Sequence, residues 1–216
     1  MSENPTQETL SRKEREKRAR QQDILKAARE LFAAKGFRDT TLDEIAQKAE
    51  FGKGTLYNYF ASKEDIFHAI IDQAIENSIA TARECSAVPG DLRTRLTAYA
   101  RASMLYIRDN GELLHAIFLE LHGGRKSDTS RLKEIVRRSR TATDIVGALI
   151  QKEMEAGTIR QGDPADFITM LDDMIRGFAS KRIFLHGELG PDEVDRQASL
   201  IVSVLLDGIT VRHSKG

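Results

Sequence analysis

The sequence predicts an all-α protein of about nine helices. Apolar residues recur at spacings of three and four along most of the 216 residues, which is the repeat of a helix with one buried face. No run alternates between apolar and polar residues as a half-buried strand does, and no internal repeat is visible. Glycine, proline and helix-capping residues separate the apolar stretches. The chain is long enough to bury a substantial core, as one large domain or two small ones.

The first predicted helix covers residues 21–35. Gly36 followed by Phe37 fits a left-handed C-terminal cap with its usual hydrophobic contact. The inward face of this helix is aliphatic and aromatic, and consists of Ile24, Leu25, Ala28, Leu31 and Phe32.

Two short helices joined by a tight turn are predicted next. Thr41 and Glu44 have the spacing of a capping box, in which each side chain bonds to the other residue's backbone N–H, so a helix begins there. Gly52 can cap a second helix over residues 53–60, and Ser62 three residues before Asp65 begins another. The second helix is only about two turns long and buries little.

The turn between the two short helices, residues 49–52, reads Ala-Glu-Phe-Gly. A left-handed backbone at Glu50 is expected there, at a cost of order 1 kcal/mol for a residue with a Cβ.

The outward residues of the second short helix explain its presence. Lysine, hydroxyl and amide side chains there can meet phosphates and base edges, and Gly54 has no side chain to hold the backbone away from a partner. Glycine inside a helix costs roughly 1 kcal/mol against alanine, so close approach of a partner is the simplest reason for it. The alternative is a solvated face with a chance glycine.

Residues 53–60, Lys-Gly-Thr-Leu-Tyr-Asn-Tyr-Phe, followed by Ser-Lys-Glu at 62–64, resemble the fingerprint of the tetracycline-repressor (TetR) family of bacterial regulators. The resemblance covers roughly residues 21–72. It implies an N-terminal three-helix DNA-binding domain containing a helix-turn-helix, and a C-terminal helical domain for ligand binding and dimerisation. The expected division is a basic flexible arm at 1–20, the DNA-binding domain at 21–66 and the helical body at 67–216.

The resemblance also implies roles for single residues. Positions matching Thr41, Tyr57 and Lys63 hold phosphates in the family, and Leu56 and Phe60 pack inward. One difference from the family is the turn, where Ala-Gly-Val-Ser is common. The complete expected DNA-binding set is Thr40, Thr41, Lys53, Gly54, Thr55, Tyr57, Asn58, Tyr59 and Lys63.

Charge is distributed unevenly although the formal net charge is zero. Residues 12–38 carry ten Lys and Arg against four Asp and Glu, a net charge of +6, whereas the chain after residue 63 is net acidic. A positive end steers that end toward a polyanion. Two interpretations of the arm at 1–20 are open: it contacts DNA, or it only keeps the protein dispersed.

Helical segments fill the rest of the sequence. A long helix after Ser62 is expected to continue to about Glu84, and turn residues at 88–90, 109–111 and 123–124 are expected to end successive helices. The remaining expected helices are one that ends at Gly157, one near residues 165–186 and one near residues 192–213.

The last two helices are the most apolar. Small residues among their large ones allow close backbone approach, which suggests a four-helix interface with a second copy; the family uses these helices in that way. The alternative is burial inside one subunit. The expected interface residues are Phe178, Ile183, Ile201, Val202, Leu205 and Ile209.

A pocket for an unidentified, largely apolar effector is expected among the helices of the body. Aromatic residues and methionines at helical spacing are also what an ordinary core contains, so both interpretations are open. The expected pocket residues are Tyr99, Met104, Tyr106, Ile107, Phe118, His122, Met170 and Met174.

Other function classes find little support in the sequence. Motifs for phosphate-cradling loops, zinc peptidases and serine hydrolases are not found, so we expect no catalytic residues, metal or cofactor. A single cysteine, Cys85, no long apolar run and no signal peptide favour a cytoplasmic protein without membrane contact. The resemblance implies that the protein is bacterial and lies at the nucleoid when it is bound to DNA. The expected function is a ligand-responsive repressor that binds a palindromic operator as a dimer. The alternative is a constitutive dimeric DNA-binding protein with no effector.

Overall fold

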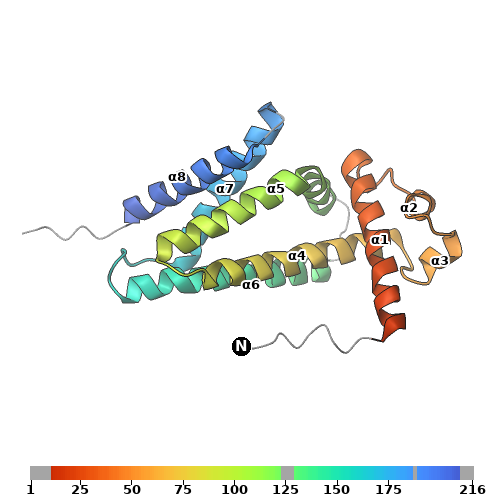
Figure 1. Cartoon of the computed structure of the whole chain (residues 1–216), viewed down its shortest axis with the longest axis horizontal. Coiled ribbons are helices and arrows are strands. Elements are labelled where there is room, and N and C mark those ends of the chain that lie inside the picture. The colour runs from red at the N-terminus through yellow and green to blue at the C-terminus, as the bar shows by residue number, and fades with distance from the viewer. Residues whose placement is uncertain (1–10, 123–128, 187–188, 210–216) are drawn as a thin grey trace, which may run out of the picture. The chain divides into compact units, whose positions relative to one another are not determined.

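The structure is a computed structural model that describes residues 11–122, 129–186 and 189–209. The described residues contain eight α-helices and no strand, which confirms the predicted all-α fold (Figure 1). The helices, in chain order, are α1 (Arg12–Lys35), α2 (Leu42–Lys48), α3 (Lys53–Tyr57), α4 (Lys63–Ala87), α5 (Leu92–His122), α6 (Thr129–Glu155), α7 (Pro164–His186) and α8 (Pro191–Ile209).

Helix α5 is one helix where the sequence analysis expected two. The Asp-Asn-Gly segment at 109–111 does not end it, and the Asn110 side-chain amide donates to the Tyr106 carbonyl 3.0 Å away. Met104 and Leu113, on either side of that segment, are both buried. Burial of one large apolar side chain contributes about 1.5–3 kcal/mol, more than the roughly 1 kcal/mol that an interior glycine costs. Packing therefore overrides the local turn preference.

Helix α1 begins nine residues earlier than expected. Ser11 forms a complete capping box with Glu14: the Ser11 N–H donates to a Glu14 carboxylate oxygen at 2.8 Å, and the Glu14 N–H donates to the Ser11 hydroxyl at 3.3 Å. The prediction of a flexible arm over 1–20 is therefore wrong for residues 12–20, which are helical. Residues 1–10 lie outside the described residues.

Two other predicted helix ends also differ from the structure. Helix α3 stops at Tyr57 rather than at residue 60, because Asn58 already lies at its C-terminal cap. Helix α4 begins where the sequence predicts, with the Asp65 N–H donating to the Ser62 hydroxyl at 3.1 Å, and it continues to Ala87.

The described residues divide into two compact units. One is drawn from Met1–Ile71 and His115–His122, the other from Asp72–Leu114 and Gly123–Gly216. The chain passes from one unit to the other inside α4 and again inside α5. The predicted functional division at residues 20 and 66 stays a prediction.

The first unit has an aromatic and aliphatic core. Helices α1, α2 and α3 pack in succession, and the ring of Phe67 in α4 lies 6.1 Å from that of Phe32 and 4.8 Å from that of Phe37. The side chains buried most completely in this unit are Ile24, Ala28, Phe32, Ile45, Leu56, Ile66 and Ile70. This core fixes α2 and α3 against α1 and the start of α4.

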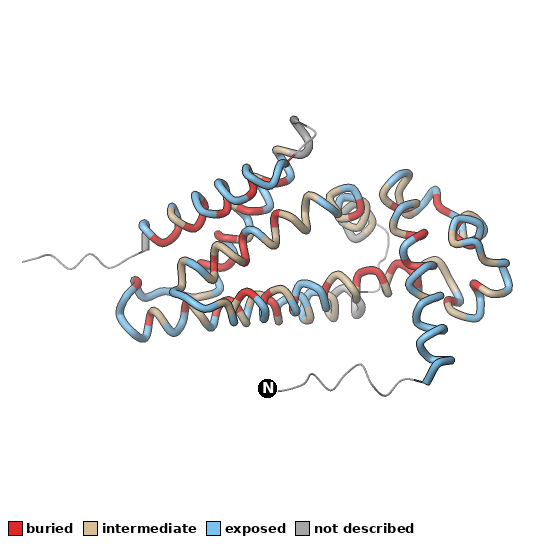
Figure 2. The backbone as a smooth tube through the Cα atoms, viewed as in Figure 1, coloured by how far each residue is buried: buried red, intermediate tan, exposed pale blue. Residues whose placement is uncertain are grey.

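The second unit is a helical body in which α6 packs on α7 and α7 packs on α8. Buried stripes line each of these helices (Figure 2). Its most deeply buried residues include Leu96, Met104, Val146, Ile150, Met154, Leu171, Ile175 and Val202. Within the described part of the chain no helix is both long and apolar enough to cross a membrane.

Candidate nucleic-acid interface

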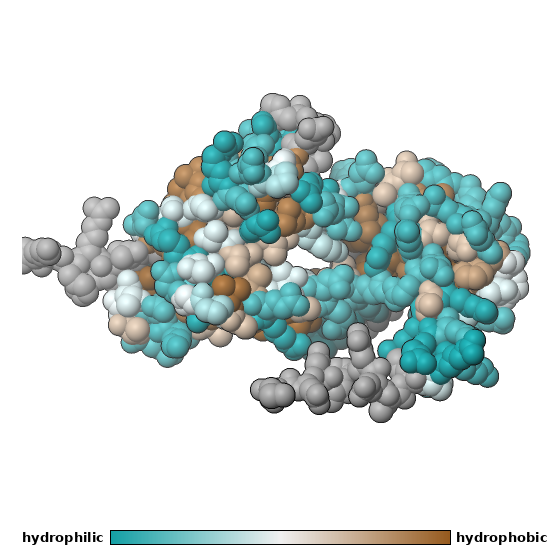
Figure 3. All heavy atoms as spheres, viewed as in Figure 1, coloured by the Kyte–Doolittle hydropathy of each residue, from teal (hydrophilic) through white to brown (hydrophobic). Residues whose placement is uncertain are grey.

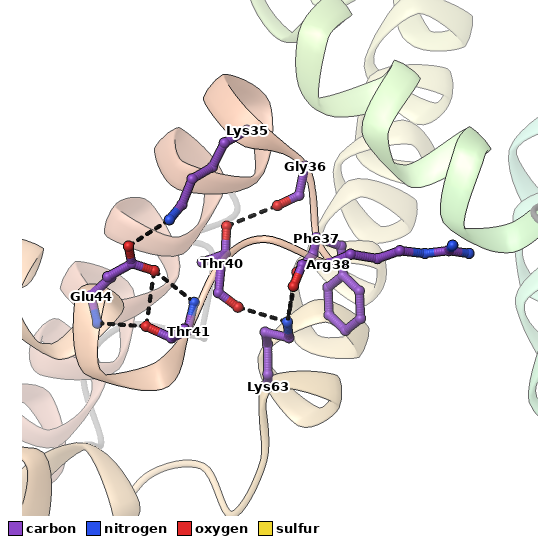
Figure 4. Close-up of polar contacts among 8 residues, drawn as sticks. All are labelled: Lys35, Gly36, Phe37, Arg38, Thr40, Thr41, Glu44 and Lys63. Carbon is purple, nitrogen blue, oxygen red and sulfur yellow. Dashed lines mark hydrogen bonds and ion pairs between the residues drawn. The ribbon is translucent and has the colours of Figure 1, made fainter.

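Helix α2 begins at the predicted capping box. The Thr41 N–H donates to a Glu44 carboxylate oxygen at 2.8 Å, and the Glu44 N–H donates to the Thr41 hydroxyl at 3.3 Å (Figure 4). Lys35 adds its ammonium to the other Glu44 oxygen at 2.5 Å. The Lys35 ammonium first, and then the backbone and side-chain hydrogen bonds of Thr41, lower the pKa of Glu44 to about 2. The carboxylate is thus charged at neutral pH and ties α1 to the start of α2.

The turn between α2 and α3 is a Schellman motif. The Phe51 N–H donates to the Ala46 carbonyl at 2.9 Å and the Glu50 N–H donates to the Gln47 carbonyl at 3.1 Å. Glu50 occupies the left-handed position with φ 59°, as the sequence predicts, and it is the single described non-glycine residue with positive φ. Glycine is the usual residue there, so the turn carries a strain of about 1 kcal/mol.

Helix α3 presents most of its surface to solvent. Leu56 is fully buried and anchors the helix, and the N–H groups of Thr55 and Leu56 donate to the Gly52 carbonyl. On the other side, Lys53, Gly54, Tyr57 and Asn58 are exposed, with the Tyr57 side chain 45% exposed. Thr55 and Tyr59 are half-buried. The DNA-binding residues predicted on α3 and directly after it are therefore fully or partly accessible.

Gly54 has no structural reason inside the chain to be glycine. A Cβ built at this position meets no atom within 4 Å, and the backbone φ is not in the positive range. Since glycine costs about 1 kcal/mol in a helix, its presence fits the close approach of something outside the protein.

Lys53 is paired in the free protein. Its ammonium lies 2.8 Å from a carboxylate oxygen of Asp43, and both side chains are about three-fifths exposed, at 60% and 63%. The hydrogen bond and charge of Asp43 raise the pKa of Lys53. A pair this exposed contributes little to stability, so Lys53 can exchange Asp43 for a phosphate at small cost.

Two of the predicted DNA contacts have other roles. Thr40 is only 1% exposed and its hydroxyl donates to the Gly36 carbonyl at 2.8 Å. The Lys63 ammonium donates to the carbonyl oxygens of Phe37 at 2.7 Å and Thr40 at 2.6 Å. It also donates to the Arg38 carbonyl at 3.1 Å and lies 4.5 Å from the centre of the Phe37 ring (Figure 4). All three donors of Lys63 are thus used inside the unit, so its geometry does not agree with a phosphate contact, and neither does the buried Thr40.

The residues predicted to line the effector pocket differ in how far they are buried. Tyr99 and Met104 are buried, Tyr106, Ile107 and Met174 are half-buried, and Met170 is 43% exposed and so does not line an interior cavity. The side chains of Phe118 and His122 lie outside the described residues.

A polar pair joins two helices in this part of the body. The Tyr99 hydroxyl donates to an Asp172 carboxylate oxygen at 3.0 Å, from α5 to α7. Burial, together with the Asp172 charge, raises the pKa of Tyr99. Burial also raises the pKa of Asp172, although the Tyr99 hydrogen bond acts in the opposite direction.

The predicted dimer residues on α8 lie on the inner face of the helix. Ile201, Val202 and Leu205 are 8%, 0% and 6% exposed within the single chain, so the choice of these residues is corrected. The exposed apolar residues of α8 are instead Leu200 at 53% and Val204 at 58%, one turn apart. Sequence periodicity does not separate the two faces because both are aliphatic. Phe178 is half-buried, and the side chains of Ile183 and Ile209 lie outside the described residues.

Comparison with known proteins places this geometry in a family. Residues 24–70 match the family model of bacterial regulatory proteins of the tetR family. The transcriptional activator FasR of Mycolicibacterium smegmatis is 31% identical over 99 residues, which span 46% of this chain and 45% of FasR. The transcriptional repressor AcnR of Corynebacterium diphtheriae is 25% identical over 163 residues, which span 75% of this chain and 80% of AcnR.

The solved structures extend the likeness in fold to nearly the whole chain. The transcriptional regulator FadR of Bacillus subtilis, in complex with stearoyl-CoA, superposes with a TM-score of 0.72 at 20% identity, covering 87% of this chain and 98% of that one. The family match falls on the capped α2, the turn and α3 described above. Residues 24–70 of this chain thus carry the helix-turn-helix domain of the tetR family of bacterial regulatory proteins, and the fold of the chain is that of solved tetR-family regulators.

Proposed function

We propose that this chain is a ligand-responsive repressor that binds a palindromic operator as a homodimer and releases it when a small molecule binds the helical body. The observation that carries the proposal is the outer surface of α3, where an open Gly54 lies between the exposed Lys53 and Tyr57. This combination suits a backbone that approaches a groove closely, with a cation and a phenol at hand for phosphates.

Seven of the nine residues predicted to contact DNA remain in the proposed interface. Tyr57 meets a phosphate, and the exposed Thr41 meets another in exchange for the Glu44 oxygen to which its hydroxyl donates at 2.9 Å. The side chains of Thr55, Asn58 and Tyr59 face base edges. Lys53 breaks its ion pair with Asp43 and contacts the DNA phosphate backbone, and Gly54 lets α3 enter the groove. Thr40 and Lys63 support this surface from inside the unit by holding the segment between α1 and α2.

Dimerisation is proposed through the outer faces of α7 and α8. Leu200 and Val204 of α8 and Met170 of α7 are large apolar side chains that remain 43–58% exposed in the single chain. A second copy burying these faces would remove apolar area from water at about 25 cal/mol per Å². A two-fold dimer also places two copies of α3 at half-sites about 34–36 Å apart, or further apart for a wider operator.

The proposed effector is a largely apolar molecule held among α4–α8, with the Tyr99–Asp172 pair as its polar contact. FadR was crystallised with stearoyl-CoA, so long-chain acyl-CoA esters are the first compounds to test. Release follows if the ligand binds the DNA-free conformation more tightly than the bound one. Relatives include both an activator and a repressor, and repression is the sign that we propose. Binding to the chromosome implies a cytoplasmic protein.

The test begins with selection of operator DNA from a random pool by the full-length protein, followed by footprinting. We expect a palindromic sequence protected over two half-sites. Tyr57→Ala should weaken binding at least tenfold, whereas Val136→Ala, at a residue of matching exposure on α6, should leave it unchanged. If Tyr57→Ala binds as the native chain does, α3 is not the interface.

Effector release is tested on the selected operator. Acyl-CoA esters of graded chain length are added to the protein–DNA complex, and the release of labelled duplex is measured by anisotropy. A length-dependent release supports the sensor, and Tyr99→Phe should shift the concentration needed. If no apolar compound releases the duplex, the chain is a constitutive DNA-binding protein, which is the alternative function.

A further inference from the structure

The first turns of α1 extend beyond the core of their unit. Residues 11–20 are exposed without exception, and the first buried side chain of the helix is Ile24 (Figure 2). The capping box between Ser11 and Glu14 holds the start of this extension in helical form. Hydrophilic side chains gather over the same turns in Figure 3. A capped, fully exposed helix end is therefore part of the first compact unit.

The cations on this extension are arranged by face. The buried face of α1 includes Ile24, Ala28 and Phe32, which recur at intervals of four. Counting back from Ile24 by four, three and four residues gives Arg20, Lys17 and Lys13. Residues three and four apart lie on one side of a helix. The side of α1 that is apolar in its buried part thus carries cations in its exposed N-terminal part. We call Lys13, Lys17 and Arg20 the basic stripe.

The charges of the basic stripe are not paired by any of the residues that the structure describes. Residues 11–20 hold six cations and two carboxylates. Glu14 accepts a hydrogen bond from the Ser11 hydroxyl, and Glu16, which lies three residues after Lys13 and four before Arg20, is paired with Arg12. Among the described residues, none forms an ion pair with any member of the basic stripe.

We propose that the basic stripe binds the phosphate backbone of duplex DNA outside the half-site that α3 contacts. This inference rests on the proposed DNA binding and adds a second contact surface to it. The first and last cations are seven residues apart, so the basic stripe spans about 10 Å of helix axis, which equals about three base-pair steps of 3.4 Å along the duplex axis. The basic stripe continues the side of α1 that packs against its unit. On that side α2 contacts α1, and α3 in turn contacts α2, so the stripe flanks the proposed interface.

A merely solubilising extension makes a different prediction. Its charges would attract DNA weakly and without regard to face, so any three cations would count equally. A contact surface instead depends on the members of the basic stripe. The chain offers a matched control in Arg15, Arg18 and Lys26, which lie on other sides of α1 and are exposed as well.

The experiment compares two full-length variants on the selected operator in a duplex with long flanks. One carries Lys13→Gln, Lys17→Gln and Arg20→Gln, and the other carries Arg15→Gln, Arg18→Gln and Lys26→Gln. Affinity is measured by anisotropy across a salt series, and circular dichroism checks the helix content. The slope of log K against log salt concentration is negative, and each lost phosphate contact reduces its magnitude by about 0.9.

We expect the slope of the stripe variant to decrease in magnitude by between two and three and its affinity to fall at least tenfold. The slope of the control variant should decrease in magnitude by less than one. Trimming the flanks from the duplex should remove the difference between the native chain and the stripe variant. A conservative variant that carries Lys13→Arg and Lys17→Arg with the native Arg20 retains all three charges and should show the native slope. Equal losses in both variants, or an unchanged slope in the stripe variant, overturn the inference while leaving the proposed function intact. Failure of the native chain to bind any duplex overturns both.

Discussion

The Arg38 guanidinium donates through Nε to a carboxylate oxygen of Glu120 at 3.1 Å, which joins the segment after α1 to the end of α5. The two residues are 82 positions apart in sequence and belong to the same compact unit. Lys63 holds the same segment through its carbonyl groups. The segment that leads into α2 is thus fixed from α4 and from α5, the two helices that continue into the other unit.

A double-mutant cycle should measure the strength of this link. Arg38 is 55% exposed and Glu120 21% exposed, so Arg38→Ala and Glu120→Ala should couple by about 0.2–1 kcal/mol in the free energy of unfolding. Denaturant unfolding of the two single variants and the double variant gives this coupling. Strict additivity of the two substitutions would show that the pair is not formed in solution.

Lys63→Met should destabilise the protein by about 1.5–3 kcal/mol, because it removes hydrogen bonds from a charged donor to partly buried carbonyls. DNA affinity should fall as the segment before α2 loosens, but the salt slope should stay unchanged. A phosphate contact would instead remove about 0.9 from the slope without affecting unfolding. Thermal unfolding and a salt titration of the same variant therefore separate the two roles.

Gly54→Ala should stabilise the free protein by up to about 1 kcal/mol and yet weaken operator binding at least tenfold, since the added methyl group meets nothing in the chain but stands between α3 and the groove. Gly147→Ala in α6 is the control, because a Cβ there meets only ordinary contacts at 3.9 Å. The control should gain stability and keep its DNA affinity. Undiminished binding by Gly54→Ala would contradict the close approach.

Glu50→Gly should raise the free energy of unfolding by about 1 kcal/mol, because glycine adopts φ 59° without a steric penalty. Gly36→Ala should do the reverse, since that backbone lies at φ 81° and ψ 167°, a region essentially limited to glycine. Chemical denaturation of both variants measures the two effects. A loss of stability in Glu50→Gly would mean that the turn relies on a contact of the carboxylate.

Acid should weaken the DNA-binding unit through Glu44. The folded-state pKa of about 2 lies below the ordinary value of 4.5, so its stabilising effect is present above pH 4.5 and is lost as the pH falls toward 2. Glu44→Gln should reduce this acid-dependent loss in unfolding experiments between pH 7 and pH 2. Parallel pH profiles for the native chain and the variant would exclude Glu44 as the cause.

Local signals in the sequence were sufficient to predict the start of α2, the start of α4 and the left-handed Glu50. In each, a few neighbouring residues determine the backbone through short-range hydrogen bonds. The continuity of α5 through residues 109–111 depends instead on tertiary burial on both sides of that segment. Propensity alone does not report such packing.

The candidate site shows the same division. The exposed surface of α3 follows from the position of one inward residue, Leu56, and could be predicted. The use of Lys63 as a donor to three backbone carbonyls could not, because those carbonyls belong to a segment more than 20 residues away. The outer face of α8 was missed because Leu200 and Val204 are as apolar as their inward neighbours.

The length of α3 limits how much sequence information the protein can extract. Its five residues rise about 7 Å, close to two base-pair steps of about 3.4 Å. Even at three base pairs per helix, two half-sites specify only about 12 bits. To distinguish one operator from about a million competing sites requires about 20 bits of sequence information. The remaining specificity must come from the flexibility and groove width of base pairs that α3 does not contact. Operators of this protein should therefore share a DNA shape as well as a base sequence.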